Sequence, residues 1–177
     1  SAIFGTENNM CNQPIGKWNV SKVIDMSSMF WGAINFNQPI EDWDVSKVTN
    51  MNAMFYGSED FNLPIGIWDV SSVTNMGFMF SNAVKFNQPI GNWDVSSVTT
   101  MQFMFEVANE FNQPIGDWDV SSVSDMTNMF HFAEDFNQDL TGWCVSNINS
   151  IPDIFAMAYA SFEVSRGPVN RYSSFIG

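Results

Sequence analysis

Basic residues, histidine and cysteine are scarce in this chain. Its 177 residues include 6 Lys plus Arg against 19 Asp plus Glu, and the formal net charge is −13. A surface with so few cations cannot neutralise phosphates, so we expect neither nucleic-acid binding nor docking on anionic lipid. Charged residues make up only 14% of the chain and apolar residues 45%, which favours a folded domain with a core over disorder.

The chain also lacks any apolar run long enough to span a bilayer. It begins at Ser1 without a signal-like segment, and we interpret it as a processed product or an excised fragment. The lone histidine, His131, comes without recognisable partners for a Ser–His–Asp site, and the motifs GxGxxG, P-loop, CxxC and HExxH are absent. The sequence therefore predicts no enzyme activity and no cofactor.

Six copies of a 25-residue phrase organise the chain. The pattern FNQPIGxWDVSxVxxMxxMFxxAxx recurs without insertion, and position 1 of the copies falls at Cys11, Phe36, Phe61, Phe86, Phe111 and Phe136. One copy is too short to bury its own apolar residues, whereas stacked copies bury them against each other. We therefore predict six turns over residues 11–160, a partial N-terminal turn or cap over 1–10 and a C-terminal cap over 161–177. Two cysteines are too few for a disulfide framework, and five intervening turns of ~4.8 Å keep Cys11 and Cys144 too far apart to pair.

Two spacing patterns within each copy predict an α/β turn. In the fourth copy, one face of a helix is indicated by Val98, Met101, Met104, Phe105 and Ala108. Ile90, Trp93 and Val95 follow the leucine-rich-repeat spacing, which predicts a short strand over residues 92–96. Pro89 favours an extended return loop over 86–90, although a strand there stays open. The expected fold class is an α/β repeat solenoid, leucine-rich-repeat-like, with a short strand plus a helix in each of six turns.

The phrase FNQPIGNWDVSSVTTMQFMF, residues 86–105, resembles the 25-residue repeat of BspA-type, leucine-rich-repeat-like surface proteins. Related repeats occur in mycoplasma lipoproteins, marine bacterial surface proteins and some protists and algae. The match covers residues 11 to about 160, because WDVS, VTxM, MF and FNQ recur together in phase. The resemblance implies an extracellular or surface-exposed adhesion and binding module without catalytic residues.

Residues of one type recur at equivalent positions of successive copies, and each such column is a candidate functional site. The acidic column Asp44, Asp69, Asp94 and Asp119 could hold a row of calcium ions, although capping of the next element or an Asx-turn is the favoured interpretation. The asparagine column is expected to form a structural ladder or to bond its own loop; it comprises Asn12, Asn37, Asn62, Asn87, Asn112 and Asn137. The tryptophan and methionine columns are expected to fill the core.

Positions that change from copy to copy are the predicted contact surface. We expect partner contacts from Trp31, Tyr56, Phe78, Phe103 and Phe132, on the exposed side of the predicted helices, and Phe78 with Phe103 should form a small apolar patch. Positions 6 and 7 vary as well, for example Glu41-Asp42 against Gly66-Ile67. A fixed core with a changing surface predicts a binding scaffold.

The leading prediction is a non-catalytic module, at the cell surface or secreted, for adhesion to a protein or glycan partner. One alternative is a structural subunit of a large assembly, for instance an organelle-associated one, that docks through its exposed aromatic residues. The other is a calcium-stabilised structural rod.

Overall fold

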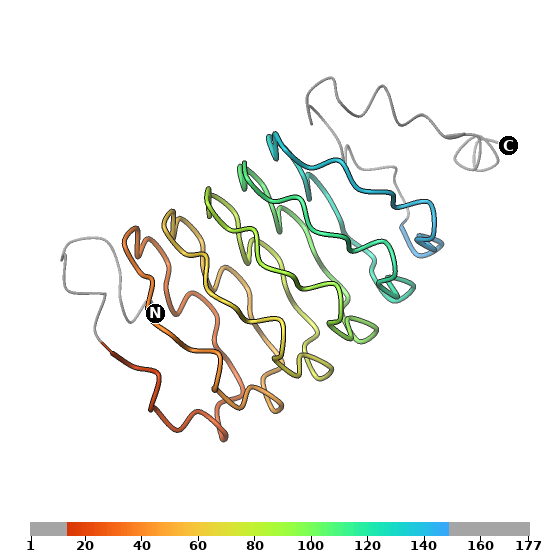
Figure 1. Ribbon diagram of the computed structural model, residues 1–177. Coiled ribbons are helices and arrows are strands. Elements are labelled where there is room, and N and C mark those ends of the chain that lie inside the picture. The colour runs from red at the N-terminus through yellow and green to blue at the C-terminus, as the bar shows by residue number, and fades with distance from the viewer. Residues whose placement is uncertain (1–13, 149–177) are drawn as a thin grey trace, which may run out of the picture.

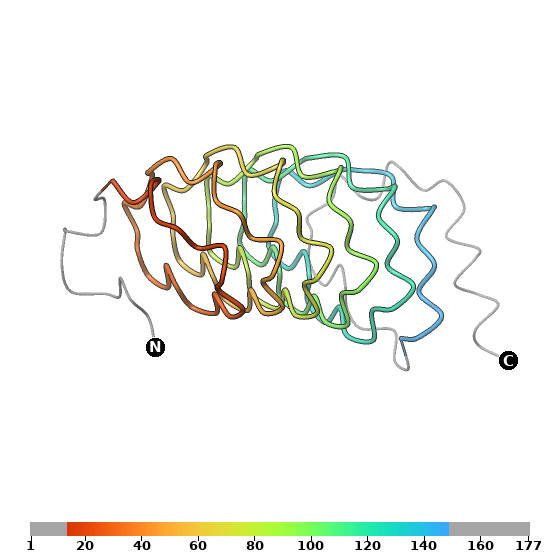
Figure 2. The same cartoon turned by 90° about the horizontal axis from the view of Figure 1, so that it is seen from below.

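The computed structural model describes residues 14–148. The predicted N-terminal cap over 1–10, the C-terminal cap over 161–177 and the second half of the sixth copy lie outside these residues. Within the described range the chain winds in successive 25-residue turns that follow one another along one axis (Figures 1 and 2).

The turns contain almost no regular secondary structure. The described residues hold no helix, and their β structure consists of four isolated parallel bridges: Asp25–Asn50, Asn50–Asn75, Asn75–Thr100 and Thr100–Asp125. All of these residues stand at position 15 of their copies, so one parallel contact per turn continues along the stack. The predicted α/β solenoid with a strand and a helix per turn is therefore wrong.

The segment predicted as a helix is instead a run of tight turns. In the fourth copy the N–H groups of Met104, Glu106 and Ala108 donate to the carbonyl three residues earlier, at 3.1–3.2 Å. The alternate N–H groups, beginning with Met101 and Phe103, donate to carbonyls of the next turn at 2.8–2.9 Å. An α-helix would direct every N–H group to the residue four positions earlier. Here half of them hold the neighbouring turn, so helical apolar spacing coexists with a non-helical backbone.

This run forces left-handed backbone at two positions of each copy. Position 18 has positive φ in all five described turns, at Ser28, Ala53, Phe78, Phe103 and Asn128. Position 22 does as well, at Gly32, Gly57, Asn82, Val107 and Phe132. A residue with a Cβ loses roughly 1–2 kcal/mol in this conformation, and glycine and asparagine tolerate it best. Bulky residues at these two positions therefore carry a local cost.

The strand predicted over residues 92–96 is also absent. The N–H of Trp93 donates to the carbonyl of Ile90 at 3.1 Å, and that of Val98 donates to Val95 at 2.9 Å, so both bonds close turns within one copy. The link to the preceding turn comes from a side chain, because Trp93 Nε1 donates to the Ile65 carbonyl at 3.2 Å. The same indole bond recurs from Trp43, Trp68, Trp118 and Trp143. The return loop shows no backbone bridge over 86–90 either, so the alternative strand is not formed.

The core is built from the apolar columns that the sequence predicts. Within a turn, Phe55 and Phe61 stack at 4.0 Å between ring centroids, and Phe55 continues to Phe80 of the next turn at 5.6 Å. The core tryptophans from Trp43 to Trp118 are 3–4% exposed, and the methionines of positions 16 and 19 are buried throughout the described turns. The interpretation of these two columns as core residues is confirmed for the methionines of the described turns and for Trp43 to Trp118, whereas Trp18 is 46% exposed and Trp143 is half-buried. Aromatic stacking along the axis joins consecutive turns through their most apolar side chains.

Candidate functional site

The carboxylates of the acidic column accept hydrogen bonds from residues of their own turn. Asp44, Asp69 and Asp94 each accept, through Oδ1, the hydroxyl of the serine two residues later at 2.6 Å and its backbone N–H at 3.1–3.2 Å. The serine hydroxyl, followed by the backbone N–H, holds the pKa of Asp44 and Asp94 below the ordinary value, and Asp119 is lowered in the same way by Ser121. These contacts are Asx-turns, so the local interpretation explains the column.

Calcium coordination remains a separate question. In residues 14–148 no group of three His, Cys, Asp or Glu side chains is close enough to hold a metal ion. Each carboxylate of the column therefore offers its unused oxygen alone, whereas calcium takes six to eight oxygen ligands. The calcium ladder over Asp44, Asp69, Asp94 and Asp119 stays a prediction for a chelation experiment.

The asparagine column forms a hydrogen-bonded ladder between turns. Asn87 Oδ1 accepts the backbone N–H of Asn112 at 3.0 Å and Gln113 Nε2 at 2.8 Å, and Gln113 Nε2 also donates to the Asn87 carbonyl. The same contacts join Asn62 to copy four and Asn112 to copy six. One amide oxygen thus satisfies two donors of the following turn. The predicted structural role of these asparagines is confirmed for Asn62, Asn87 and Asn112.

Position 6 is less free to vary than its sequence suggests. A Cβ added to Gly91 would overlap the carbonyl oxygen of Pro114, and the same holds for Gly66 and Gly116 against the next turn. Close packing of the return loops therefore requires glycine at this position. Glu41 and Thr141 are the exceptions, and one carboxylate oxygen of Glu41 is buried without a hydrogen-bond partner.

The surface that varies from turn to turn lies along the run of tight turns. We define the variable face as positions 17, 18, 21 and 22 of the five described turns: residues 27–28, 31–32, 52–53, 56–57, 77–78, 81–82, 102–103, 106–107, 127–128 and 131–132. Positions 16, 19, 20 and 23 point into the core instead, since they are buried in each of these turns, whereas the residues of the variable face are exposed or half-buried except Ala53, Gly77 and Ser81. All five predicted contact residues therefore fall on the variable face: Trp31, Tyr56, Phe78, Phe103 and Phe132.

Aromatic side chains pair along this face. Trp31 stacks on Tyr56 with ring centroids 4.4 Å apart, and Phe78 stacks on Phe103 at 4.8 Å with an interplanar angle of 9°. Trp31 is 39% exposed, whereas the two phenylalanines are half-buried. The expected contact between Phe78 and Phe103 is thus present, although on tight turns instead of helices. The two pairs place apolar surface at position 21 in the first two turns and at position 18 in the next two.

A polar row that the sequence analysis missed continues position 21. Ser81 Oγ donates to Glu106 Oε2 at 3.0 Å, and Glu106 Oε1 lies 3.4 Å from His131 Nδ1. His131 is therefore half-buried and paired, not a lone solvent-facing side chain. The carboxylate stands between the serine and the histidine, so the imidazole cannot take the serine proton as it does in a Ser–His–acid triad. Recurrence of polar residues at one position in three consecutive copies was the available signal.

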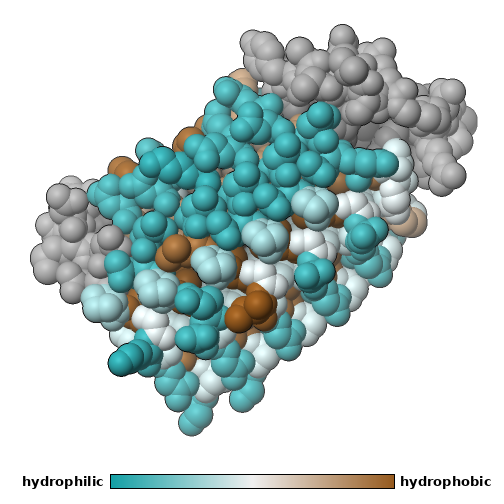
Figure 3. Space-filling model, in the orientation of Figure 1, coloured by the Kyte–Doolittle hydropathy of each residue, from teal (hydrophilic) through white to brown (hydrophobic). Residues whose placement is uncertain are grey.

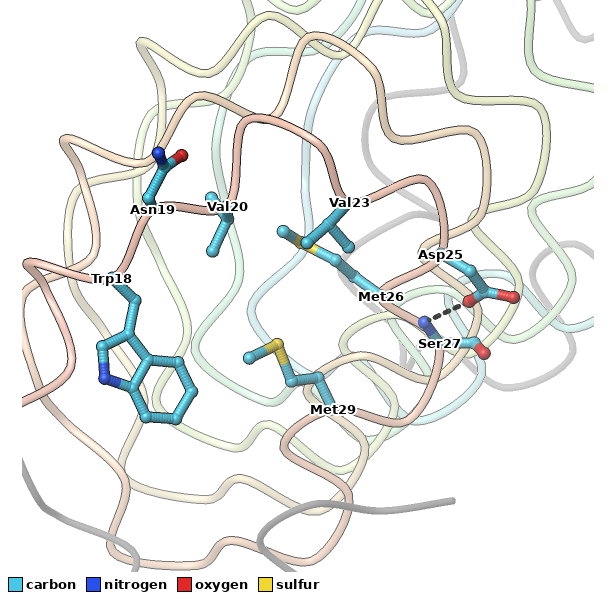
Figure 4. A pocket seen from close by; sticks show the side chains of 8 residues that line it. All are labelled: Trp18, Asn19, Val20, Val23, Asp25, Met26, Ser27 and Met29. Carbon is cyan, nitrogen blue, oxygen red and sulfur yellow. Dashed lines mark hydrogen bonds between the residues drawn. The ribbon is translucent and has the colours of Figure 1, made fainter.

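A cavity of about 570 Å³ opens at the N-terminal end of the described stack (Figure 4). Its lining includes Trp18, Val20, Val23, Met26 and Met29, which converge on it, and the Asp25 carboxylate bonds to the Ser27 N–H at its rim. In copies two to five the residues equivalent to Trp18 and Val23 are buried, whereas here Trp18 is 46% exposed and Val23 is half-buried. The cavity therefore lies at the edge of the described residues, on the side where a preceding turn packs in later copies, and we assign it no ligand.

Charge is distributed unevenly over the surface. Acidic residues gather at position 9 and at positions 24 and 25, where Glu59, Asp60, Glu110, Glu134 and Asp135 stand; Lys85 pairs with Asp60 at 2.6 Å. Hydrophilic side chains form a continuous band across one side of the molecule, above a less polar zone (Figure 3). On the variable face of the described turns, Glu106 is the single acidic residue, and no Lys or Arg stands there.

Two further features bear on the predicted setting. No helix in the described part of the chain is long and apolar enough to cross a membrane. Cys144 is an exposed free thiol, and Cys11 lies outside the described residues.

Comparison with known proteins places the chain in a family. No curated protein and no solved structure matches it. The family model described as "Mycoplasma protein of unknown function, DUF285" matches residues 1–106 and again residues 88–166. The two matched segments together span most of the chain, as expected when a family model describes repeated units. The chain belongs to this repeat family of mycoplasma proteins.

Proposed function

We propose that this chain is a non-catalytic binding scaffold, displayed at a cell surface or secreted, that recognises a macromolecular partner through the variable face. The observation that carries the proposal is the contrast between two sets of positions. Core and ladder positions repeat almost without change, whereas the outward positions of the same turns alternate among aromatic, aliphatic, amide and hydroxyl side chains. A scaffold that presents changing side chains on a constant frame is suited to recognition.

Three further observations support a binding role over catalysis. The two aromatic pairs offer partly exposed apolar surface, which is the surface that interface anchors provide. Ser81, Glu106 and His131, three polar residues of the variable face, are engaged with each other in one row. The cavity of Figure 4 is lined mainly by apolar side chains, and the single carboxylate of its lining, Asp25, accepts the Ser27 N–H at the rim. The likeness of the repeat to BspA-type surface proteins favours adhesion as the biological setting.

A binding assay with paired variants tests the proposal. The purified chain is applied to arrays of purified secreted glycoproteins and of neutral glycans. In the face variant, Trp31→Ser, Tyr56→Ser, Phe78→Ser and Phe103→Ser remove both aromatic pairs. In the control variant, Asp69→Asn and Asp94→Asn alter the acidic column. We expect specific binding that the face variant loses and the control keeps. Binding that only the control loses would contradict recognition by the variable face.

A second candidate function is a structural subunit of a large assembly. It is favoured by the low content of charged residues and by the partly exposed Phe78–Phe103 pair, which a freely diffusing protein tends to avoid. Size-exclusion chromatography of a gentle extract from the source organism separates the two candidates. Elution near 20 kDa, or as one longer polypeptide, supports the adhesion module. Elution in a much larger particle supports the structural subunit. Protease treatment of intact cells tests surface display independently, because an accessible chain is digested without lysis.

A further inference from the structure

Bulky apolar residues occupy left-handed positions in only part of the described stack. In the first two turns, positions 18 and 22 hold Ser28, Gly32, Ala53 and Gly57, all of them small. In the next three turns the same positions hold Phe78, Phe103, Val107 and Phe132 beside two asparagines. Left-handed backbone disfavours residues with a large or β-branched side chain, so backbone conformation alone would select glycine or asparagine throughout.

These four apolar residues are not needed to complete the core. The core of the same turns is formed by other positions, including Met79, Phe80, Met104 and Phe105, which are 0% exposed. Phe78, Phe103, Val107 and Phe132 remain half-buried on the outside of this layer. Residues kept in an unfavourable conformation at the surface indicate a role other than folding. We call these four side chains the apolar ridge.

The surroundings of the ridge restrict the chemistry of a partner. The chain carries a net charge of −13, yet its acidic columns lie at positions 9, 24 and 25, outside the variable face. Glu106, the one acidic residue on this face, is already bonded to Ser81 and His131. A basic partner would bind most favourably at the acidic columns. The ridge, which carries no charge, binds an uncharged partner most favourably.

The geometry of the phenyl rings favours a peptide over a sugar. Phe78 and Phe103 lie nearly parallel, at 9°, with centroids 4.8 Å apart, so one face of each ring is covered by the other ring. A pyranose ring binds best against an open aromatic face. The ring edges instead suit the interdigitating packing of aliphatic and aromatic side chains, and Val107 and Phe132 at position 22 of the fourth and fifth copies add apolar surface to the same face.

We propose that the apolar ridge of Phe78, Phe103, Val107 and Phe132 docks an uncharged, apolar peptide segment of a protein partner. This inference rests on the proposed function and specifies which part of the variable face binds and what the partner presents there. The Trp31–Tyr56 pair stands at position 21 of the first two turns, is not part of the ridge, and serves as an internal comparison.

The test uses a displayed library of random linear peptides selected on the full, immobilised chain. Two variants are compared: Phe78→Ser with Phe103→Ser, and Trp31→Ser with Tyr56→Ser. The repeat accommodates serine at both positions, because Ser28 occupies position 18 and Ser81 position 21. Each variant is accepted as folded if its urea-unfolding transition stays as cooperative as that of the wild type and its midpoint stays close to the wild-type value. If the phenylalanine variant fails this criterion, Phe132→Asn replaces it, since Asn82 fills position 22 in the third copy.

We expect the selected peptides to be rich in aromatic and aliphatic residues and poor in Lys and Arg. Their binding should weaken about tenfold or more in the phenylalanine variant and persist in the Trp31/Tyr56 variant. Selection of basic peptides would overturn the inference, and so would ridge-dependent binding of neutral glycans on an array. Binders that depend on Trp31 and Tyr56 alone would overturn the inference and leave the proposed function standing. Absence of any binder that depends on either pair would contradict both.

Discussion

The asparagine ladder offers a quantitative test of how the turns are held together. Asn87→Ala removes the amide oxygen that accepts both the Asn112 N–H and Gln113 Nε2. The Asn112 N–H is then left without its partner, which costs about 1–3 kcal/mol for a buried group. Because Asn112 is half-buried and water can partly replace the bond, we take the lower part of that range. Gln113 loses one of its two bonds, worth about 0.5–1 kcal/mol, so the expected loss is about 2 kcal/mol.

Two companion variants make the prediction specific to the acceptor. Asn87→Asp keeps an oxygen in the same place, and we expect it to retain most of the stability lost in Asn87→Ala. Gln88→Leu copies the natural Leu63 at position 3 of the preceding copy. It removes the two bonds from Gln88 Nε2 to Asn62 but leaves Asn62 Oδ1 with the Asn87 N–H, so its cost should stay below that of Asn87→Ala.

Urea unfolding followed by fluorescence of the buried tryptophans measures all three variants. With a denaturant slope of about 2 kcal/mol per molar urea, the Asn87→Ala midpoint should fall by about 1 M. Equal losses for Asn87→Asp and Asn87→Ala would refute the acceptor role. A loss below about 0.5 kcal/mol for Asn87→Ala would show that the ladder contributes little to stacking.

Three other predictions address the acidic column and the close packing of the return loops. The pKa values of Asp44, Asp94 and Asp119 are lowered in the folded chain; this stabilisation is present above the unfolded value of 3.8 and is lost as pH falls through the lower folded values. Ser46→Ala with Ser96→Ala should therefore flatten the loss of stability below about pH 4, measured by urea unfolding at a series of pH values; an unchanged acid profile would contradict the assignment. Gly91→Ala should lower the free energy of unfolding by about 1–3 kcal/mol, because its Cβ meets the Pro114 carbonyl. Glu41→Gly should raise it by about 1 kcal/mol by removing a buried, unpaired carboxylate oxygen. Thermal or urea unfolding that reverses this order would refute the packing argument. EDTA should leave the melting temperature unchanged, since the carboxylates of the column are held by serines; a fall that added calcium restores would support the calcium-stabilised rod instead.

The sequence predicts which side chains are buried, and it does so without predicting the backbone. Column identity alone places Trp93, Met101 and Phe105 in the core, because residues that recur in register must stack on their equivalents. The spacing of Val98, Met101, Met104 and Phe105 also fits one face of a helix. Successive three-residue turns return an apolar side chain inward at nearly the same intervals, so this periodicity cannot distinguish the two.

A helix and a run of tight turns differ in the acceptors to which the backbone N–H groups donate. A helix satisfies its own N–H groups, whereas here the alternate N–H groups of Met101 and Phe103 reach Asp125 and Thr127 of the next turn. That choice depends on a neighbour 24 residues away in the chain, which local propensity does not encode. Gly32 and Gly57 were the signal in the sequence against a helix, since both stand inside the predicted helices and both have positive φ.

For the site, the sequence identified the five outward aromatic residues but not their arrangement. Trp31 with Tyr56 and Phe78 with Phe103 share positions in adjacent copies, and sharing a position was enough to predict contact. The Ser81–Glu106–His131 row follows the same rule, and it was missed because each residue type was considered by itself. Position 6 shows the opposite error: its variation suggested a free surface, whereas the Pro114 carbonyl leaves no room for a Cβ at Gly91.

The absence of helices from the described turns changes what a variable surface residue means. On an exposed helix face most residue types are nearly equivalent, so a phenylalanine there carries little information. At positions 18 and 22 the backbone is left-handed in every described turn, and a large side chain costs roughly 1–2 kcal/mol relative to glycine. Phe78, Phe103, Val107 and Phe132 together therefore oppose folding by several kcal/mol, a sizeable share of the stability of an ordinary domain. Stacking of Phe78 on Phe103 offsets part of this cost for one pair, but Val107 has no ring to stack. The remainder is most simply explained if the side chains are retained for contact with another molecule.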